Sequence, residues 1–106
     1  MENKKTLVIG ASENPARYSN LAIHRLKTNQ HPVVAIGNKA GVVAGIAIGT
    51  EKIQLKDIDT ITLYLNPILQ KQYYDYIISL HPKRIIFNPG TENDELAQLY
   101  DRFHAK

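Results

Sequence analysis

Residues 5–19 read KTLVIGASENPARYS, and this stretch decides the fold. An apolar, β-branched run ends abruptly at Gly10-Ala11-Ser12, and a helical apolar period begins only after Tyr18, which predicts a strand, a loop and a helix. Glycine at the carboxyl end of a buried strand lets the backbone approach a ligand, while the next helix offers unpaired N–H groups to an anion. The stretch therefore predicts a phosphate-binding loop, although it has one glycine where the dinucleotide fingerprint has three.

The rest of the chain repeats the alternation of strand and helix. We expect further strands at residues 33–36, 46–48, 60–65 and 84–87, and helices at about residues 19–29, 67–80 and from 93 onward. The strand at 46–48 is expected to be a short edge strand in an otherwise irregular segment. Such alternation is typical of right-handed βαβ units. It predicts one domain over residues 1–106, with a three-layer, Rossmann-like, doubly wound parallel α/β sheet in the strand order 3-2-1-4-5.

Composition limits the class of protein. A chain of 106 residues can bury one core but has no room for a separate catalytic domain. No apolar run approaches the roughly 18 residues of a membrane span. The absence of cysteine and of a signal-peptide pattern favours a cytoplasmic protein without disulfides. The formal charge of +3 comes from scattered basic residues, which suits a small anionic ligand and argues against nucleic acid or membrane partners.

Turn-forming residues follow four of the expected strands, at residues 10–12, 37–39, 66–67 and 88–90. Because the carboxyl ends of parallel strands share one edge of the sheet, these four turns are expected to surround a ligand crevice. An NAD-binding domain has an acidic residue after its second strand, where this chain has Gly37-Asn38-Lys39. A lysine there favours a phosphorylated ribose, as in NADP or coenzyme A, unless Lys39 is simply a solvated loop residue.

These motifs together resemble a known family. The runs VIGASENPARYS at 8–19, IGNK at 36–39 and NPGTEN at 88–93 are similar to those of the small stand-alone CoA-binding proteins. The fold of that family is similar to the N-terminal domain of the succinyl-CoA synthetase alpha subunit. The resemblance covers nearly the whole chain and implies a Rossmann-like domain that binds coenzyme A without an established reaction.

The resemblance also implies a set of site residues. The diphosphate would lie against Gly10, Ala11, Ser12, Arg17, Tyr18 and Ser19, and the phosphorylated ribose would meet Asn38 and Lys39. The adenine would be flanked by Leu65, Asn66 and Pro67, and the pantetheine would be bordered by Asn88, Pro89 and Gly90. The site is completed by Asn14 and Gly37. Relatives commonly continue into a further strand that carries a cysteine, which this sequence does not contain. Many relatives also have Asn-Pro where this chain has Asn38-Lys39.

Residues that could perform catalysis have simpler interpretations. The histidines lack metal-ligand spacing and are interpreted as surface or capping residues; they are His24, His31, His81 and His104. Ser12 lacks the Gly-x-Ser-x-Gly elbow of a nucleophile, so its hydroxyl is expected to donate to a phosphate. Glu92 is either a carboxylate near the reactive end of the ligand or a helix-start acid. Among the tyrosines, Tyr18 and Tyr64 are the expected ligand contacts.

The sequence therefore predicts a protein that binds coenzyme A or an acyl-CoA, with no catalytic residues and no metal site. The alternative is an NADP-dependent reductase or another nucleotide-using enzyme domain, which would need a substrate pocket and a proton donor. A Tyr-x-x-x-Lys pair would favour the reductase, and the sequence contains none. A protein partner and the oligomeric state are left open.

Overall fold

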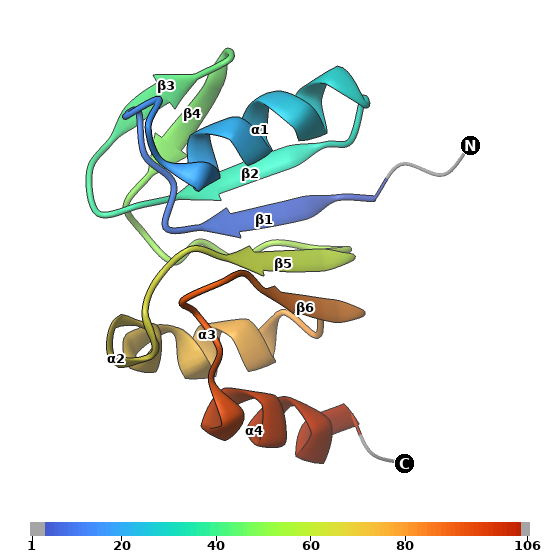
Figure 1. Cartoon of the computed structure of the whole chain (residues 1–106). Helices are drawn as coiled ribbons and strands as arrows, with labels where there is room; N and C mark the ends of the chain where they lie inside the picture. The colour runs from blue at the N-terminus through green and yellow to red at the C-terminus, as the bar shows by residue number, and fades with distance from the viewer. Residues whose placement is uncertain (1–3, 105–106) are drawn as a thin grey trace.

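The computed structural model describes residues 4–104, which form a six-stranded sheet with helices on both faces (Figure 1). The strands are β1 (Thr6–Ile9), β2 (Val33–Ile36), β3 (Gly41–Val43), β4 (Ile46–Gly49), β5 (Thr60–Leu63) and β6 (Arg84–Phe87). The helices are α1 (Tyr18–Thr28), α2 (Pro67–Gln70), the 3₁₀ turn η1 (Lys71–Tyr73), α3 (Tyr74–Ser79) and α4 (Asp94–His104). The α/β, Rossmann-like fold expected from the sequence is confirmed.

The strands lie in the order β3-β4-β2-β1-β5-β6. All neighbouring pairs are parallel except β3 and β4. The five expected strands therefore follow the expected order, with β1 beside β5 at the point where the chain switches from one half of the sheet to the other. The antiparallel strand β3 was not expected. It is joined to β4 by Ala44-Gly45, both with positive φ (51° and 81°), and alanine is not a residue by which such a hairpin turn is recognised.

Two apolar clusters hold the layers together, one on each face of the sheet. Leu7, Ile9, Ile61 and Leu63 pack on the side of α3 and α4, together with residues of those helices. Val8 and the alternate residues of β2 and β4 pack on the side of α1. Side chains of a strand point alternately to its two faces, so β1, buried at every position, contributes to both clusters.

The segment expected as one helix over residues 67–80 is instead α2, η1 and α3 in succession. Gln70 and Tyr73 are both buried, and a 3₁₀ turn aligns positions i and i+3 more closely than an α-helix does. The strand expected over residues 60–65 ends at Leu63, because Gly10 turns away and leaves Leu65 without a partner on β1. None of the helices in residues 4–104 is long and apolar enough to cross a membrane.

Candidate functional site

The loop after β1 is wedged between the ends of two neighbouring strands. Gly10 has a φ of 95°, and a Cβ atom there would approach the carbonyl carbon of Tyr64, just after β5, to 2.9 Å. On the other side, a Cβ atom at Gly37, just after β2, would lie 2.4 Å from the carbonyl oxygen of Ala11. Both positions therefore require glycine, because any side chain would push the loop away from the sheet edge.

The same loop is held by its own hydrogen bonds. The N–H groups of Gly10 and Ala11 both donate to the carbonyl oxygen of Ile36, at 2.9 and 3.0 Å. Ser12 Oγ accepts the N–H of Asn14 at 3.1 Å, which leaves the hydroxyl proton for another acceptor. Asn20 Nδ2 donates to the Ser12 carbonyl at 3.1 Å. The amides of Gly10 and Ala11 are thus occupied, and a bound anion would meet the donors that follow them.

Those following donors lie at the start of α1. The preceding residue, Arg17, provides no side-chain cap for the helix. Within residues 4–104, the N–H groups of Tyr18 and Ser19 find no acceptor. Orphan N–H groups and the positive end of the helix dipole favour an anion at this point. The exposed guanidinium of Arg17 adds a full positive charge.

These groups open into a hollow at the carboxyl edge of the sheet, which we call the edge cavity. Its volume is about 510 Å³. Its lining comes from all four expected turns and from the α2–η1 segment: Gly10, Ala11, Ser12, Arg17, Tyr18, Ser19, Gly37, Asn38, Tyr64, Leu65, Asn66, Leu69, Gln72, Tyr73, Pro89 and Thr91. The residues that follow β1, β2 and β5 contribute to this lining, and the arrowheads of these strands point to the left in Figure 1. The structure thus brings together most of the residues expected from the sequence.

Five of the expected residues do not line the edge cavity. Asn14 Oδ1 instead accepts the N–H of Ala16, and Pro67 is the first residue of α2. Lys39 is exposed in the bend after Asn38, and Gly90 is exposed in the turn after β6. Asn88 Nδ2 donates to Thr62 Oγ1 at 2.7 Å. Asn88 lines a different hollow of about 550 Å³ between α1 and the strands β5 and β6, which we call the sheet-face groove.

Four lining residues were not expected: Leu69, Gln72, Tyr73 and Thr91. Leu69 and Tyr73 fit the apolar period of a helix, so the sequence pattern assigns them to the core. The short α2–η1 segment begins at the sheet edge and places both beside the cavity. Of these four residues, only Thr91 could have been found from the sequence, because it lies three residues after Asn88 in a turn that was itself expected.

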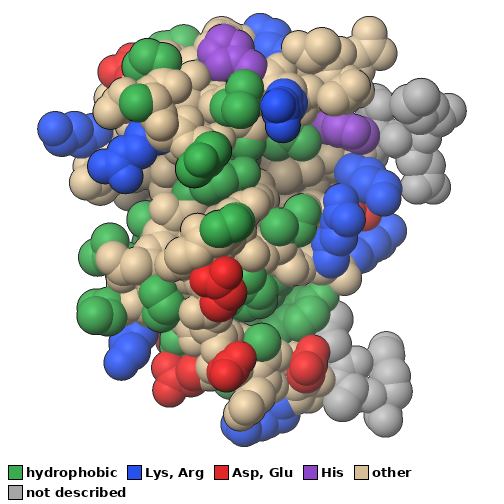
Figure 2. All heavy atoms as spheres, in the orientation of Figure 1, with side chains coloured by type: hydrophobic (Ala, Val, Ile, Leu, Met, Phe, Trp, Pro, Cys, Tyr) green, Lys and Arg blue, Asp and Glu red, His purple; other side chains and the backbone are tan. Residues whose placement is uncertain are grey.

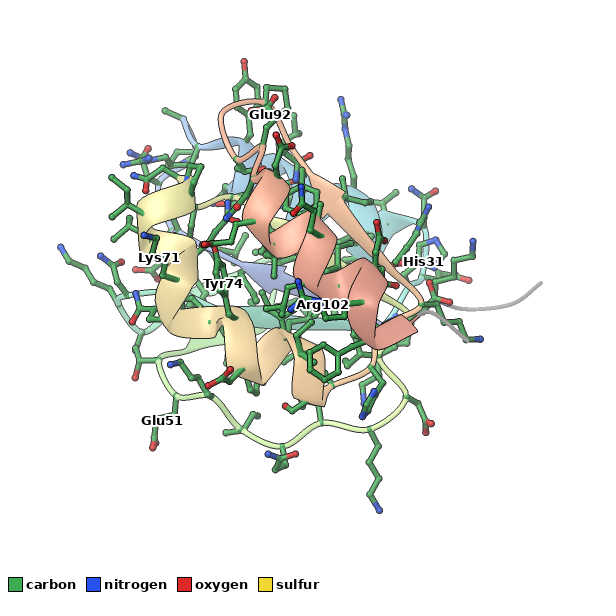
Figure 3. The ribbon with its side chains drawn as sticks, turned by 90° about the horizontal axis from the view of Figure 1, so that it is seen from below. His31, Glu51, Lys71, Tyr74, Glu92 and Arg102 are labelled. Carbon is green, nitrogen blue, oxygen red and sulfur yellow. The ribbon has the colours of Figure 1, made fainter. Side chains whose placement is uncertain are left out.

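A buried polar cluster joins two of the turns around the edge cavity. Gln70 is completely buried, and its Nε2 donates to the carbonyl oxygens of Leu65 at 2.7 Å and Thr91 at 2.8 Å. Its Oε1 accepts from Asn93 Nδ2 at 2.8 Å. Asn93 Nδ2 also donates to the hydroxyl of Tyr74, which lies between α3 and α4 in Figure 3. The turns after β5 and β6 are therefore fixed to one side chain.

The ionisable side chains that line the edge cavity are Arg17 and three tyrosines, Tyr18, Tyr64 and Tyr73. The carboxylate of Glu92 accepts the N–H of Gly90 at 2.9 Å and so belongs to its own turn. In residues 4–104, no three His, Asp or Glu side chains gather in a way that could hold a metal ion. The arrangement offers hydrogen-bond donors and one cation to an anionic ligand.

The fold and the site define a Rossmann-like α/β protein with a cavity at the carboxyl edge of its sheet. Residues 4–105 match the family described as CoA binding domain, and the chain belongs to that family. The resemblance seen in the sequence is thereby confirmed. A search of the curated proteins gives no match.

Solved structures agree with this assignment. A crystal structure of a protein described only as uncharacterized is 46% identical, with a TM-score of 0.94 over 97% of this chain and 85% of that one. A hypothetical protein from Pyrococcus horikoshii OT3 is 25% identical, with a TM-score of 0.84 over 96% of this chain and 72% of that one. A conserved hypothetical protein from Pyrococcus furiosus, 24% identical, shares the fold, with a TM-score of 0.82 over 95% and 88% of the two chains.

Proposed function

We propose that this protein binds coenzyme A, free or acylated, in the edge cavity and does so without chemical turnover. The observation that carries the proposal is the start of α1, where unpaired N–H groups and Arg17 face a cavity bordered by the glycine loop. Membership of a CoA binding domain family supports the choice of ligand. The diphosphate would accept hydrogen bonds from Tyr18 N, Ser19 N and the hydroxyl of Ser12.

The turn after β2 would select the phosphorylated ribose. Asn38 lines the edge cavity, and Lys39 follows it in the same bend with its side chain exposed. An ammonium group there attracts a ribose phosphate, whereas the carboxylate that holds the free hydroxyls of NAD is absent. The adenine would then lie near Leu65 and Asn66, at the end of β5.

The chemistry of the lining supports a binding role. Catalysis of thioester cleavage needs a nucleophile or a general base near the reacting carbon. The described residues that line the edge cavity include no carboxylate, histidine or lysine. Ser12, the hydroxyl nearest the proposed diphosphate, has no histidine or carboxylate among its hydrogen-bond partners.

Thermal unfolding with a panel of nucleotides tests the ligand. At 100 times its Kd, a ligand that binds only the folded state adds about 2.7 kcal/mol to the free energy of unfolding. Coenzyme A should therefore raise the melting temperature by several degrees, while NAD, which lacks a ribose phosphate, should leave it nearly unchanged. No shift with coenzyme A, or equal shifts with NAD, would refute the proposal. Acetyl-CoA incubated with the protein should release free thiol no faster than in buffer.

A matched pair of arginine variants tests the site. Arg17→Ala removes a cation from the lining of the edge cavity and should weaken coenzyme A binding about tenfold in calorimetry. Arg102→Ala makes the same change of charge on α4, away from the cavity (Figure 3), and should leave the affinity unchanged. Equal effects of the two substitutions would mean that only net charge matters.

A further inference from the structure

Beyond the end of the sheet ladder, side chains join the turns after β5 and β6. The ladder between these two strands ends at the pair Leu63 and Phe87. No backbone hydrogen bond connects the turns that follow, anywhere in the described part of the chain. Asn88 Nδ2 donates to the carbonyl oxygen of Leu63 at 2.9 Å, at the very end of the strand. Farther out, the link between the two turns is the side chain of Gln70.

The amide of Gln70 uses both of its donors on these turns. Gln70 is completely buried at the end of α2, and its Nε2 donates to the carbonyl oxygens of Leu65 at 2.7 Å and Thr91 at 2.8 Å. Its Oε1 accepts from Asn93 Nδ2. A flipped amide would place Oε1 against two carbonyl oxygens, so the network admits one orientation. At this side-chain length, only glutamine offers two donors and one acceptor in one plane.

The same network reaches the starts of two helices. Asn93 precedes α4, and its Oδ1 accepts the N–H of Leu96 at 3.1 Å. Asn66 caps α2 in the same way, by accepting the N–H of Leu69 at 3.0 Å. Gln70 lies between these two capped starts. The positions of both turns and of both helix starts therefore depend on one another.

The two carbonyl partners of Gln70 belong to residues on the ligand side of the network. Leu65 and Thr91 line the edge cavity, from the turns after β5 and β6. Gln70 lies behind this wall and is not part of the lining. It can therefore act on a ligand only through the turns that it holds.

The two sides of the cavity mouth differ in chemical character. Figure 2 shows basic side chains at the upper left, over the loops before α1 and β3, and hydrophobic ones below them, over α2. The exposed residues of those loops include Arg17 and Lys39, whereas α2 exposes Ile68 and Leu69. A ligand with anionic and uncharged parts would contact both sides. The uncharged side is the one that Gln70 holds in place.

We propose that Gln70 is a positioning residue for the ligand, because it holds the turns after β5 and β6 at the spacing that coenzyme A spans. This inference rests on the proposed function and assigns the preformed shape of its site to one side chain. In that function the adenine would lie near Leu65, and the pantetheine arm would pass Pro89 and Thr91. A preformed site spares the ligand the cost of ordering both turns. Loss of Gln70 should therefore weaken most a ligand that contacts both.

Calorimetry with Gln70→Met tests the inference. Methionine is similar in length and volume but cannot make the three hydrogen bonds. Coenzyme A should bind about tenfold more weakly to this variant. Adenosine 3′,5′-bisphosphate has the adenine and the ribose phosphate but no pantetheine, so its affinity should fall by less than about threefold. The readout is the ratio of the two affinities, because a general loss of stability would lower both alike.

Leu80→Ala is the matched control for stability. Leu80 is buried at the far end of α3 and lines no part of the edge cavity. Its truncation should destabilise the fold at least as much as Gln70→Met does. Both of its affinities should equal those of the unchanged protein at a temperature where every variant is folded. An unchanged affinity ratio in Gln70→Met, or the same change in Leu80→Ala, would overturn the inference and leave the proposed function standing.

A measurement on the unchanged protein applies even if Gln70→Met does not fold. In NMR spectra, the side-chain amide protons of Gln70 should exchange slowly with solvent in the free protein. Coenzyme A should change their exchange little, because these hydrogen bonds precede the ligand. Fast exchange that becomes slow only with the ligand would overturn the inference, since the ligand would then order the turns. Failure of the unchanged protein to bind coenzyme A would instead refute the proposed function.

Discussion

The two faces of β5 are built differently. Ile61 and Leu63 point to the side of α3 and α4 and are completely buried in the apolar cluster there. Thr60 and Thr62 point to the other side, where they accept hydrogen bonds from Arg84 of β6 and from Asn88, which follows β6. One strand thus joins a packed core to the floor of the sheet-face groove.

The difference predicts unequal costs of substitution on the two faces. A strand covered on both faces reads as a continuous apolar run, as residues 33–36 do, whereas β5 alternates threonine with isoleucine and leucine. Thr60 and Thr62 are buried as well, but they belong to neither apolar cluster and are paired by hydrogen bonds instead. Substitutions toward α3 and α4 should therefore cost more stability than substitutions on the threonine side. The predictions below test this division, beginning with the largest effect.

Leu63→Ala should cause the greatest loss of stability. The side chain is fully buried, and the substitution leaves a cavity against α3 and α4, which typically costs about 3 kcal/mol. Chemical denaturation in urea measures the loss through the midpoint at constant m value. A cost below about 1 kcal/mol would mean that this face can repack, and the contrast between the two faces would disappear.

Gln70→Leu tests the buried polar cluster on the same side of the sheet. The substitution leaves the carbonyl oxygens of Leu65 and Thr91 and the amide of Asn93 without their partner, and should cost about 2 kcal/mol. Gln98→Leu, at an exposed position of α4, is the control and should change stability by less than about 0.5 kcal/mol. Equal costs for the two variants would show that Gln70 fills space only.

Tyr76→Phe examines how this face responds to alkaline pH. Burial, and secondarily Tyr73, raises the pKa of the Tyr76 hydroxyl, which donates to the carbonyl oxygen of Ile53 at 2.6 Å. Because the unfolded chain ionises near pH 10 and the folded one at higher pH, the stability from this group is present below pH 10. It is lost as pH rises through the folded pKa.

The variant should therefore lose about 1 kcal/mol at pH 7, from the missing hydrogen bond, and should show a shallower decline of stability above pH 10. The decline should persist in part, since the pKa values of Tyr74 and Tyr100 are also raised by burial. Denaturant midpoints between pH 7 and 11 measure both effects. An unchanged alkaline slope would contradict the prediction.

The sequence predicted the parallel part of the sheet because apolar runs and glycine turns are local signals. It missed β3, since Ala44 is an unusual residue for a turn with positive φ. It correctly assigned Tyr73 to the core but also assigned Leu69, which is 47% exposed, because a helical period identifies an apolar face and not what lies against it. The 3₁₀ turn η1 interrupts the helix and so decides which side chains face the edge cavity. This interruption depends on the burial of Gln70 between two turns that are distant in sequence.

The direction of Asn88 could have been derived from the pattern but was not. Side chains alternate along β6, so Asn88 shares a face with Ile86 and Arg84, which is the face of Thr62. Reading that alternation would have placed Asn88 in the sheet-face groove and not in the edge cavity. By contrast, the groove itself lies between α1 and the strands β5 and β6, an arrangement of elements distant in sequence that no local pattern reveals.

Thr62→Val makes the groove side of β5 resemble its packed side and should have the smallest effect on stability. Thr62 Oγ1 loses the hydrogen bond from Asn88 Nδ2, but that amide still donates to the carbonyl oxygen of Leu63 at 2.9 Å. The loss should be about 0.5 to 1 kcal/mol in urea denaturation. A loss as large as that of Leu63→Ala would mean that this hydrogen bond secures β6 to the sheet, and both faces of β5 would then contribute to folding alike.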